Sequence, residues 1–231
     1  MFRLNGLPPA IAPELLETLR SAEPATIGHF LDFGFMDCGI RALWQVPRIA
    51  GTAVTVRCAG TDSTVVHYAL GQLRPGDVLV IDRAGDIRYA PVGGGVAFAA
   101  KAAGAVAIIV DGVATDIGEI RDYAVPVWAR GLSAVTTKRH FDNGEFCVPV
   151  QCGGVPVRPG DAILADENGV LVLPPEMIAQ AAPRAVAMQQ AEGPRLAEVA
   201  KGARLPELNG TNARLRDIMA AQNAPTGGSS I

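Results

Sequence analysis

Four acidic residues lie within twelve positions of one segment, I-V-D-G-V-A-T-D-I-G-E-I-R-D-Y at 109–123. They are Asp111, Asp116, Glu119 and Asp122, and they directly follow an apolar run. Carboxylates at this density can hold a hard divalent cation, which prefers oxygen ligands. They can also carry general acid–base chemistry, or they can simply begin a helix at its positively charged end.

Asp116 stands at the expected start of a helix. The sequence D-I-G-E has the form of a capping box, in which Asp116 caps the helix and Glu119 reaches back from its third position. Asp116, Glu119 and Asp122 also recur at i, i+3 and i+6, so they share one side of that helix. Three like charges on one side are unfavourable unless water or a cation compensates them. We therefore expect Asp116 both to cap the helix and to face a cation such as Mg²⁺. We expect Glu119 and Asp122 to be solvated, or to interact with the cation only through its direct ligands.

Two other features could bind a ligand. Asp111 ends an apolar run, and open α/β sheets bind ligands at the carboxyl ends of their strands. The glycines at 93–95 open a predicted helix, whose first N–H groups and partial positive charge favour an anion. Phe98 breaks the pattern G-x-G-x-x-G, and no G-K-[ST] follows, which excludes a P-loop. His67 stands alone on a predicted helix, a position more typical of a packed or capping residue than of a general base.

The elements that must position these residues alternate between strand and helix in the middle of the chain. Runs of apolar or β-branched residues predict strands, and apolar residues at helical spacing predict the helices between them. This alternation indicates parallel β-α units. The predicted strands are 51–60, 74–82 (after a turn), 105–111 and 125–131, and the predicted helices are 64–73 and 91–104.

The two ends of the chain have a different character. The first fifty residues look helical and connective, with a helix that starts at Pro13. Residues 147–173 read as short strands joined by tight turns, and Asn168-Gly169 is a hairpin signal. We expect one domain over 1–222, in which 174–222 form a helical C-terminal arm, and a disordered tail at 223–231.

The composition narrows the class of protein. The chain has 231 residues, of which 49% are hydrophobic, and a formal net charge of −3. Its basic residues are scattered, so we expect no nucleic-acid partner. The four cysteines form no C-x-x-C and predict free thiols in a reducing compartment. Because the N-terminus does not read as a signal peptide and no apolar run is long enough to span a membrane, we expect a soluble, cytoplasmic protein.

Seven short motifs, in matching order over about residues 25–175, resemble one family core. The family is the class II pyruvate aldolases that act on 4-hydroxy-4-methyl-2-oxoglutarate. It also includes the regulator of ribonuclease activity A and proteins once labelled dimethylmenaquinone methyltransferases. The motifs are M-D-C-G-I-R (36–41), G-T-A-V-T-V (51–56), P-G-D-V-L-V-I-D (75–82), G-x-x-x-x-x-A-K-x-x-G (94–104), V-D-G (110–112), P-V-W-A-R-G (126–131) and P-G-D-x-x-x-A-D-x-N-G-V (159–170).

The resemblance implies an α/β/β/α sandwich of the swivelling-domain type, with helical N- and C-terminal segments. It also implies homo-oligomers, trimers or hexamers, with sites between subunits. The aldolases carry an acidic residue, twenty intervening residues and then Arg-Asp. Aligned on V-D-G, Asp116 takes the place of the metal-binding Asp, while Thr115 stands at the Arg and Gly94 at the upstream acid. The backbone amides of Gly95 and Val96 match those that hold pyruvate, and the implied cofactor is Mg²⁺ or Mn²⁺.

An Arg-Asp pair does occur at Arg121 and Asp122, but it lies six residues too late for the signature. We therefore do not expect Arg121 to replace the missing Arg, nor do we favour Arg88 or Arg130. The sequence predicts a divalent-metal-dependent carbon–carbon lyase that acts on a small anionic oxo or hydroxy acid, with weak or absent cleavage of 4-hydroxy-4-methyl-2-oxoglutarate. The alternatives are a non-catalytic regulatory protein of the same fold, or a related metal-dependent enzyme with a different substrate.

Overall fold

The structure, a computed structural model, describes residues 1–222. The chain divides into one unit of Met1–Val186 and a second that begins at Ala187. The expected disordered tail at 223–231 lies outside the described residues. The candidate site belongs entirely to the first unit.

Four parallel strands form the middle of the first unit. Each is joined to the next by a segment that contains a helix, so the β-α order predicted from the sequence is confirmed. Every residue of β4 is buried, as expected of a strand covered on both faces. The strands are β3 (Ile49–Arg57), β4 (Asp77–Asp82), β5 (Ala107–Ala114) and β6 (Val127–Leu132), and the helices are α3 (Thr64–Leu70), α4 (Gly94–Ala102) and α5 (Ile117–Asp122).

Short strands extend this sheet and pack against it. The hairpin predicted near Asn168-Gly169 is confirmed, with its turn one residue earlier, because Asp166 pairs with Gly169. Its first strand pairs antiparallel with β3. The short strands are β1 (Phe2–Leu4), β2 (Arg41–Ala42), β7 (Gly144–Phe146), β8 (Val150–Cys152), β9 (Val155–Val157), β10 (Ala162–Asp166) and β11 (Gly169–Leu173).

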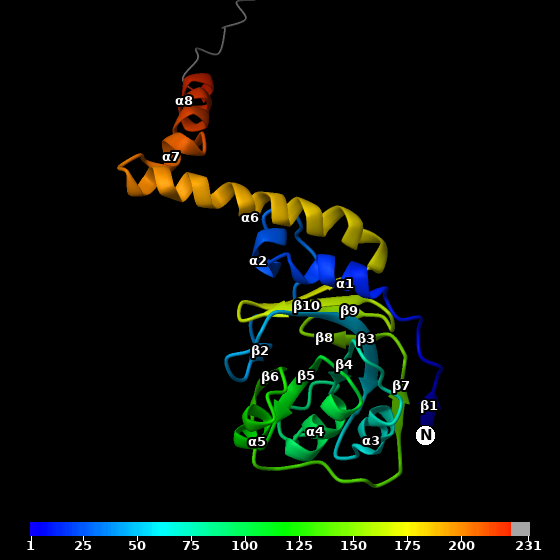
Figure 1. The fold of residues 1–231 in the computed structure, drawn as a ribbon. Helices are drawn as coiled ribbons and strands as arrows, with labels where there is room; N and C mark the ends of the chain where they lie inside the picture. Colours follow the sequence, from blue (N-terminus) through cyan, green and yellow to red (C-terminus); the bar gives the residue numbers. More distant parts are fainter. Residues whose placement is uncertain (223–231) are drawn as a thin grey trace, which may run out of the picture. The chain divides into compact units, whose positions relative to one another are not determined.

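Three apolar clusters separate four layers, which confirms the expected α/β/β/α arrangement. Leu79 and Ile81 of β4 face α3, α4 and α5, while Val78 and Val80 face the layer of short strands. The third cluster joins the outer face of β10 and β11 to helices on the opposite side. Figure 1 shows α3, α4 and α5 on one side of the sheet and two N-terminal helices on the other. These two are α1 (Pro13–Arg20) and α2 (Pro24–Ile27), and the start of α6 (Ile178–Ala200) joins them in the third cluster.

The second unit is helical, as the sequence predicts. The 3₁₀ turn η1 (Pro175–Met177) and the start of α6 belong to the first unit, and the second unit contains the rest of α6, α7 (Leu205–Leu208) and α8 (Thr211–Gln222). None of the described side chains from Ala187 onward is buried.

Within residues 1–222, no helix combines the length and hydropathy that a membrane span requires. All four cysteines are free thiols, in agreement with the sequence analysis.

Candidate functional site

Backbone contacts join the segment that leads into α4 to the end of β5. Val92 and Ala114 form a parallel bridge, and the Thr115 amide donates a hydrogen bond to the Val92 carbonyl oxygen at 2.8 Å. Ala97 is the first α4 residue whose amide bonds back, to the Gly93 oxygen at 2.9 Å. Among the described residues, the amides of Gly95 and Val96 have no acceptor within hydrogen-bond distance. These two N–H groups therefore remain available to an anion at the positive end of the helix.

Asp116 occupies the N-cap position of α5 but does not cap it. Its backbone is left-handed, with φ +53° and ψ +41°, and its side chain makes no capping hydrogen bond. The predicted capping box is therefore wrong, because a left-handed residue turns its side chain away from the amides of its own helix. Instead, Oδ2 of Asp116 accepts a hydrogen bond from the Gly94 amide at 3.1 Å, and Oδ1 accepts one from the Thr115 hydroxyl at 3.2 Å. A non-glycine residue in this region carries strain, which is common at functional sites.

Glu119 fills the space beside Gly94. A Cβ atom on Gly94 would lie only 1.8 Å from Oε2 of Glu119, and one on Gly93 would lie 2.5 Å from Oδ2 of Asp116. Both carboxylates thus approach the same turn of α4, and both glycines are required for that approach. Asp122 is exposed and does not line the cavity described next. Glu119, which is also exposed, lies beside Gly94 and likewise does not line that cavity.

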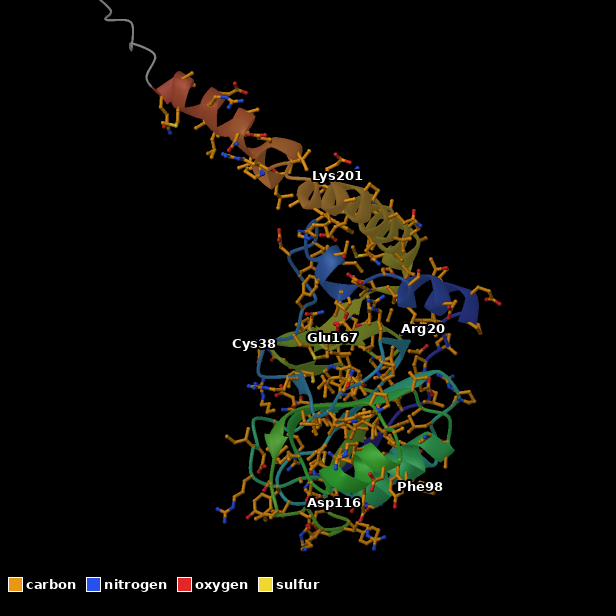
Figure 2. All side chains as sticks on the ribbon, turned by 60° about the vertical axis from the view of Figure 1, so that its left-hand side comes forward. Arg20, Cys38, Phe98, Asp116, Glu167 and Lys201 are labelled. Carbon is orange, nitrogen blue, oxygen red and sulfur yellow. The ribbon has the colours of Figure 1, made fainter. Side chains whose placement is uncertain are left out.

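A cavity of about 570 Å³ opens in front of Asp116. Figure 2 shows Asp116 on the side of the helical layer, away from Cys38 and Glu167. The walls of the cavity come from α3 and the residue before it, from the start of α4 and the segment before it, from the two residues before α5, and from the segment that joins β6 to β7. Besides Asp116, the polar residues of its lining are Ser63, His67, Thr115, Thr136, Thr137, Lys138 and Arg139, and Gly95 and Val96 line it as well.

His67 lies in this cavity wall rather than in the core. Partial burial, and secondarily the positive charge of Arg139, lower the pKa of His67 below its ordinary value. The imidazole is therefore mostly neutral near pH 7, where it can accept a proton or a hydrogen bond. The sequence favoured a packed or capping histidine, and the structure instead places it beside the other polar groups.

Asp62 holds the segment between β6 and β7 in place. Its Oδ1 accepts hydrogen bonds from the Thr64 amide at 2.9 Å and the His140 amide at 3.1 Å, and its Oδ2 accepts one from the Asp142 amide at 2.8 Å. Burial by itself would raise the pKa of Asp62. The hydrogen bonds from Thr64, Asp142 and His140 outweigh it and hold this pKa well below the usual range. This buried carboxylate fixes the backbone that carries Lys138 and Arg139.

Asp111 and Arg130 belong to a separate cluster. Arg130 donates through Nε to Asp111 and through Nη2 to Asp37 at 2.8 Å, and the Gly153 amide donates to Asp111 Oδ2 at 2.8 Å. The expectation that Asp111 faces a ligand at the strand end is therefore wrong, since β5 continues to Ala114 and the carboxylate is already paired. Arg130 is likewise already paired, and its hydrogen bonds to Asp37 and Asp111 raise its pKa.

No arginine that the sequence offered as a replacement lines the cavity. Arg88, Arg121 and Arg130 are all absent from its walls in the described structure. The cations that do line it, Lys138 and Arg139, were missed because they stand in an irregular stretch, V-T-T-K-R-H, without helical or strand periodicity. The adjacent Lys-Arg pair was their only signal.

Residues 24–172, more than half of the chain, match the family model described as RraA-like: Aldolase/RraA. A 4-hydroxy-4-methyl-2-oxoglutarate aldolase of Thermus thermophilus is 36% identical over 148 residues, which cover 64% of this chain and 85% of that protein. A Halalkalibacterium halodurans protein that provisionally bears the same name is 38% identical over 135 residues, or 58% of this chain. The chain spans only 64% of that protein's length.

A solved structure has the same fold. The RNA-processing inhibitor RraA from Thermus thermophilus superposes with a TM-score of 0.56 at 31% sequence identity, covering 61% of this chain and 84% of that one. The similar proteins thus include some named as aldolases and others named as inhibitors. These names do not decide between an enzyme and an inhibitor, so the function has to be inferred from the residues of the site.

Proposed function

The chain belongs to the RraA-like family described as Aldolase/RraA, and on this basis we propose that it is a divalent-metal-dependent carbon–carbon lyase. Its substrate would be a small anionic oxo or hydroxy acid. One observation carries this proposal: the exposed carboxylate of Asp116 and the unpaired amides of Gly95 and Val96 meet in one cavity. Catalysis on a carboxylic acid substrate requires a cation that polarises it and hydrogen-bond donors that bind its negative charge. The carboxylate would hold the cation, and the amides would be the donors.

The donor set fits Mg²⁺ or Mn²⁺. Asp116 is the carboxylate of the cavity lining and would hold the cation, whereas the carboxylate of Glu119 lies beside Gly94, outside that lining. Among the described residues, no group of three His, Cys, Asp or Glu side chains comes together as a ligand set. A cation that keeps several of its waters suits such a site. When bound, it would supply positive charge to an oxygen of the reacting acid.

The other groups would position the substrate and move protons. The amides of Gly95 and Val96 would donate hydrogen bonds to an oxyanion or a carboxylate, as in other preorganised sites. The Thr115 hydroxyl stands where the aldolase signature has Arg, and its hydrogen bond to Asp116 helps to orient that carboxylate. His67 is the group in the cavity that can accept a proton near pH 7, because its pKa is lowered by partial burial and by Arg139.

The test is release of pyruvate from 2-oxo acids that differ in their substituents at C4, coupled to lactate dehydrogenase. We expect cleavage that stops with EDTA and returns with Mg²⁺ or Mn²⁺. With 4-hydroxy-4-methyl-2-oxoglutarate itself we expect little or none, since Thr115 and Gly94 replace the Arg and the acid of the signature. An absence of metal-dependent cleavage across the series would contradict the proposal.

A non-catalytic regulatory protein is the second candidate. Two of the three signature residues are replaced, and the Thermus thermophilus structure is that of an RNA-processing inhibitor. Recovery of a stoichiometric protein partner from cell extract, together with no turnover, would favour this function. A related metal-dependent enzyme whose substrate lacks the carboxylate bound by the family Arg would instead show turnover outside the 2-oxo acid series.

We also propose a cytoplasmic location and assembly into trimers or hexamers. The four free thiols support a reducing compartment. Large apolar side chains exposed on the second unit support assembly, because soluble monomers rarely expose many of them. Among them are Leu205, Leu208, Leu215, Ile218 and Met219.

A further inference from the structure

Two cationic residues of the segment between β6 and β7 line the cavity. Lys138 and Arg139 both line it, together with Asp116 and the first turn of α4. They come from a part of the chain that the acidic signature does not include. Thr115, which stands at the signature's Arg position, is neutral, so these two residues are the cationic side chains of the cavity.

The backbone that carries them is held on both sides. The Lys138 amide donates to the Thr61 oxygen at 2.8 Å, and its own carbonyl oxygen accepts from the Ser63 amide at 2.8 Å. One residue beyond Arg139, the His140 amide donates to the buried carboxylate of Asp62. Lys138 and Arg139 therefore extend from a fixed backbone position, which reduces the entropy lost when they bind a ligand.

The positive charge of the pair is not neutralised by the protein. Within residues 1–222, neither Lys138 nor Arg139 lies within ion-pair distance of a carboxylate. By contrast, Arg130 is paired with two acids. In the cavity, two cations and two free amides face a single lining carboxylate, that of Asp116. This balance favours an anionic ligand.

We propose that Arg139, assisted by Lys138, binds the carboxylate of the substrate and so replaces the Arg that is absent at Thr115. Arg139 would supply the planar fork that matches a carboxylate, and Lys138 would supply a second positive charge. The identity of the substrate in this inference rests on the proposed lyase function. The binding of a small carboxylate does not depend on turnover, so the two can fail separately.

The experiment is titration calorimetry of the full chain with oxalate, a planar dicarboxylate, at saturating Mg²⁺ and again with EDTA. Arg139→Gln should weaken oxalate binding by about 10–100-fold, the loss expected for one charge-assisted hydrogen bond. Arg139→Lys should bind with intermediate affinity, because it keeps the charge and loses the fork. Lys138→Gln should cause a smaller loss. The matched control is Arg121→Gln, an exposed arginine outside the cavity, which should bind as the wild type does.

Each outcome decides one of the two proposals. Weakened binding in Arg139→Gln supports the inference even if the protein cleaves no substrate. If the wild type cleaves a 2-oxo acid while Arg139→Gln and Lys138→Gln keep its oxalate affinity and KM, the inference is overturned and the lyase function stands. A wild type that binds no oxalate under either condition also overturns the inference. Circular dichroism of each variant separates lost binding from lost folding.

Discussion

Oδ2 of Asp116 lies 3.1 Å from the amide nitrogen of Gly94, so the residue that begins α5 is tied to the first turn of α4. This hydrogen bond turns the carboxylate toward the unpaired amides of Gly95 and Val96 instead of toward its own helix. The proposed cation ligand and the turn with two unpaired amides therefore share one end of the sheet. Because Cβ atoms at 93 and 94 would collide with Asp116 and Glu119, the arrangement depends on glycine.

The first prediction concerns the contact between Gly94 and Glu119. Gly94→Ala places a Cβ 1.8 Å from Oε2 of Glu119, and this overpacking should lower the free energy of unfolding by about 1–3 kcal/mol. Gly95→Ala is the matched control, since its Cβ would meet nothing within 4 Å. It should be neutral or stabilising by up to about 1 kcal/mol through helix propensity. Urea unfolding measures both, and equal stability of the two variants would place Glu119 elsewhere.

The second prediction concerns pH and Asp62. Its pKa in the folded protein lies below the unfolded value of about 3.9. Its contribution to stability is therefore present above that unfolded value and is lost as the pH falls through the folded pKa. Asp62→Asn should lower the free energy of unfolding at pH 7 by about 1.5–3 kcal/mol, because charge-assisted hydrogen bonds are lost.

Urea unfolding at pH 7, 5 and 3 checks this expectation. The difference between wild type and Asp62→Asn should shrink at pH 3, where the wild-type carboxylate begins to lose its advantage. Asp142→Asn is the control in the same segment, because its side chain is exposed and only its backbone amide bonds to Asp62. A gap between wild type and Asp62→Asn that is the same at all three pH values would argue against an ionised Asp62.

The third prediction concerns His67 and Arg139. Burial is the larger cause of the lowered pKa of His67, and Arg139 is the second. Arg139→Gln should raise this pKa but leave it below the ordinary value, since the burial remains. NMR titration of the imidazole C–H resonances measures it, with Arg121→Gln as the control. An unchanged pKa in Arg139→Gln would mean that the guanidinium does not face this cavity.

The fourth prediction concerns assembly. We expect a trimer or a multiple of one, because a site with so few local ligands needs a neighbour to complete it. The helical segment at 174–222 is the proposed packing arm, and its exposed apolar side chains such as Leu215 and Ile218 would be covered. Sedimentation velocity of the full chain at micromolar concentration should show the assembly, and Leu215→Asp with Ile218→Asp should weaken it. A monomer alone in the wild type would refute the prediction.

Local patterns predicted the frame of the fold but not the partners of its charged groups. The apolar run at 105–111 identified β5, yet the strand continues to Ala114. Asp111 was therefore read as a strand end, although it lies inside the strand and pairs with Arg130. Ordinary turn and strand propensities explain the hairpin at β10 and β11, which needs no distant contact.

The site depends on contacts between residues far apart in the sequence, and these leave no periodic signal. Asp116 has the residue type of an N-cap, and only its left-handed backbone and the bond to Gly94 distinguish it from one. Lys138 and Arg139 reach the cavity because Asp62 binds the amides of a segment nearly eighty residues later. A single sequence cannot show which of several arginines folding will bring to one place.

The fifth prediction tests the central claim, that Asp116 holds a divalent cation. If Asp116 served only to accept the hydrogen bond from the Gly94 amide, Asp116→Asn would change little, because the Asn side-chain oxygen can accept the same bond. If it holds the metal, removal of its charge should abolish binding and leave the fold intact. Glu119→Gln should reduce the affinity far less, and Asp122→Asn, whose side chain lies outside the cavity, should leave it nearly unchanged.

Titration calorimetry with Mg²⁺ and Mn²⁺ on the wild type and these three variants is the most direct measurement. We predict binding in the wild type, its loss in Asp116→Asn and its retention in Asp122→Asn, all with unchanged circular dichroism. Wild-type affinity in Asp116→Asn would contradict the metal site, and Asp116 would then only tie the start of α5 to the first turn of α4.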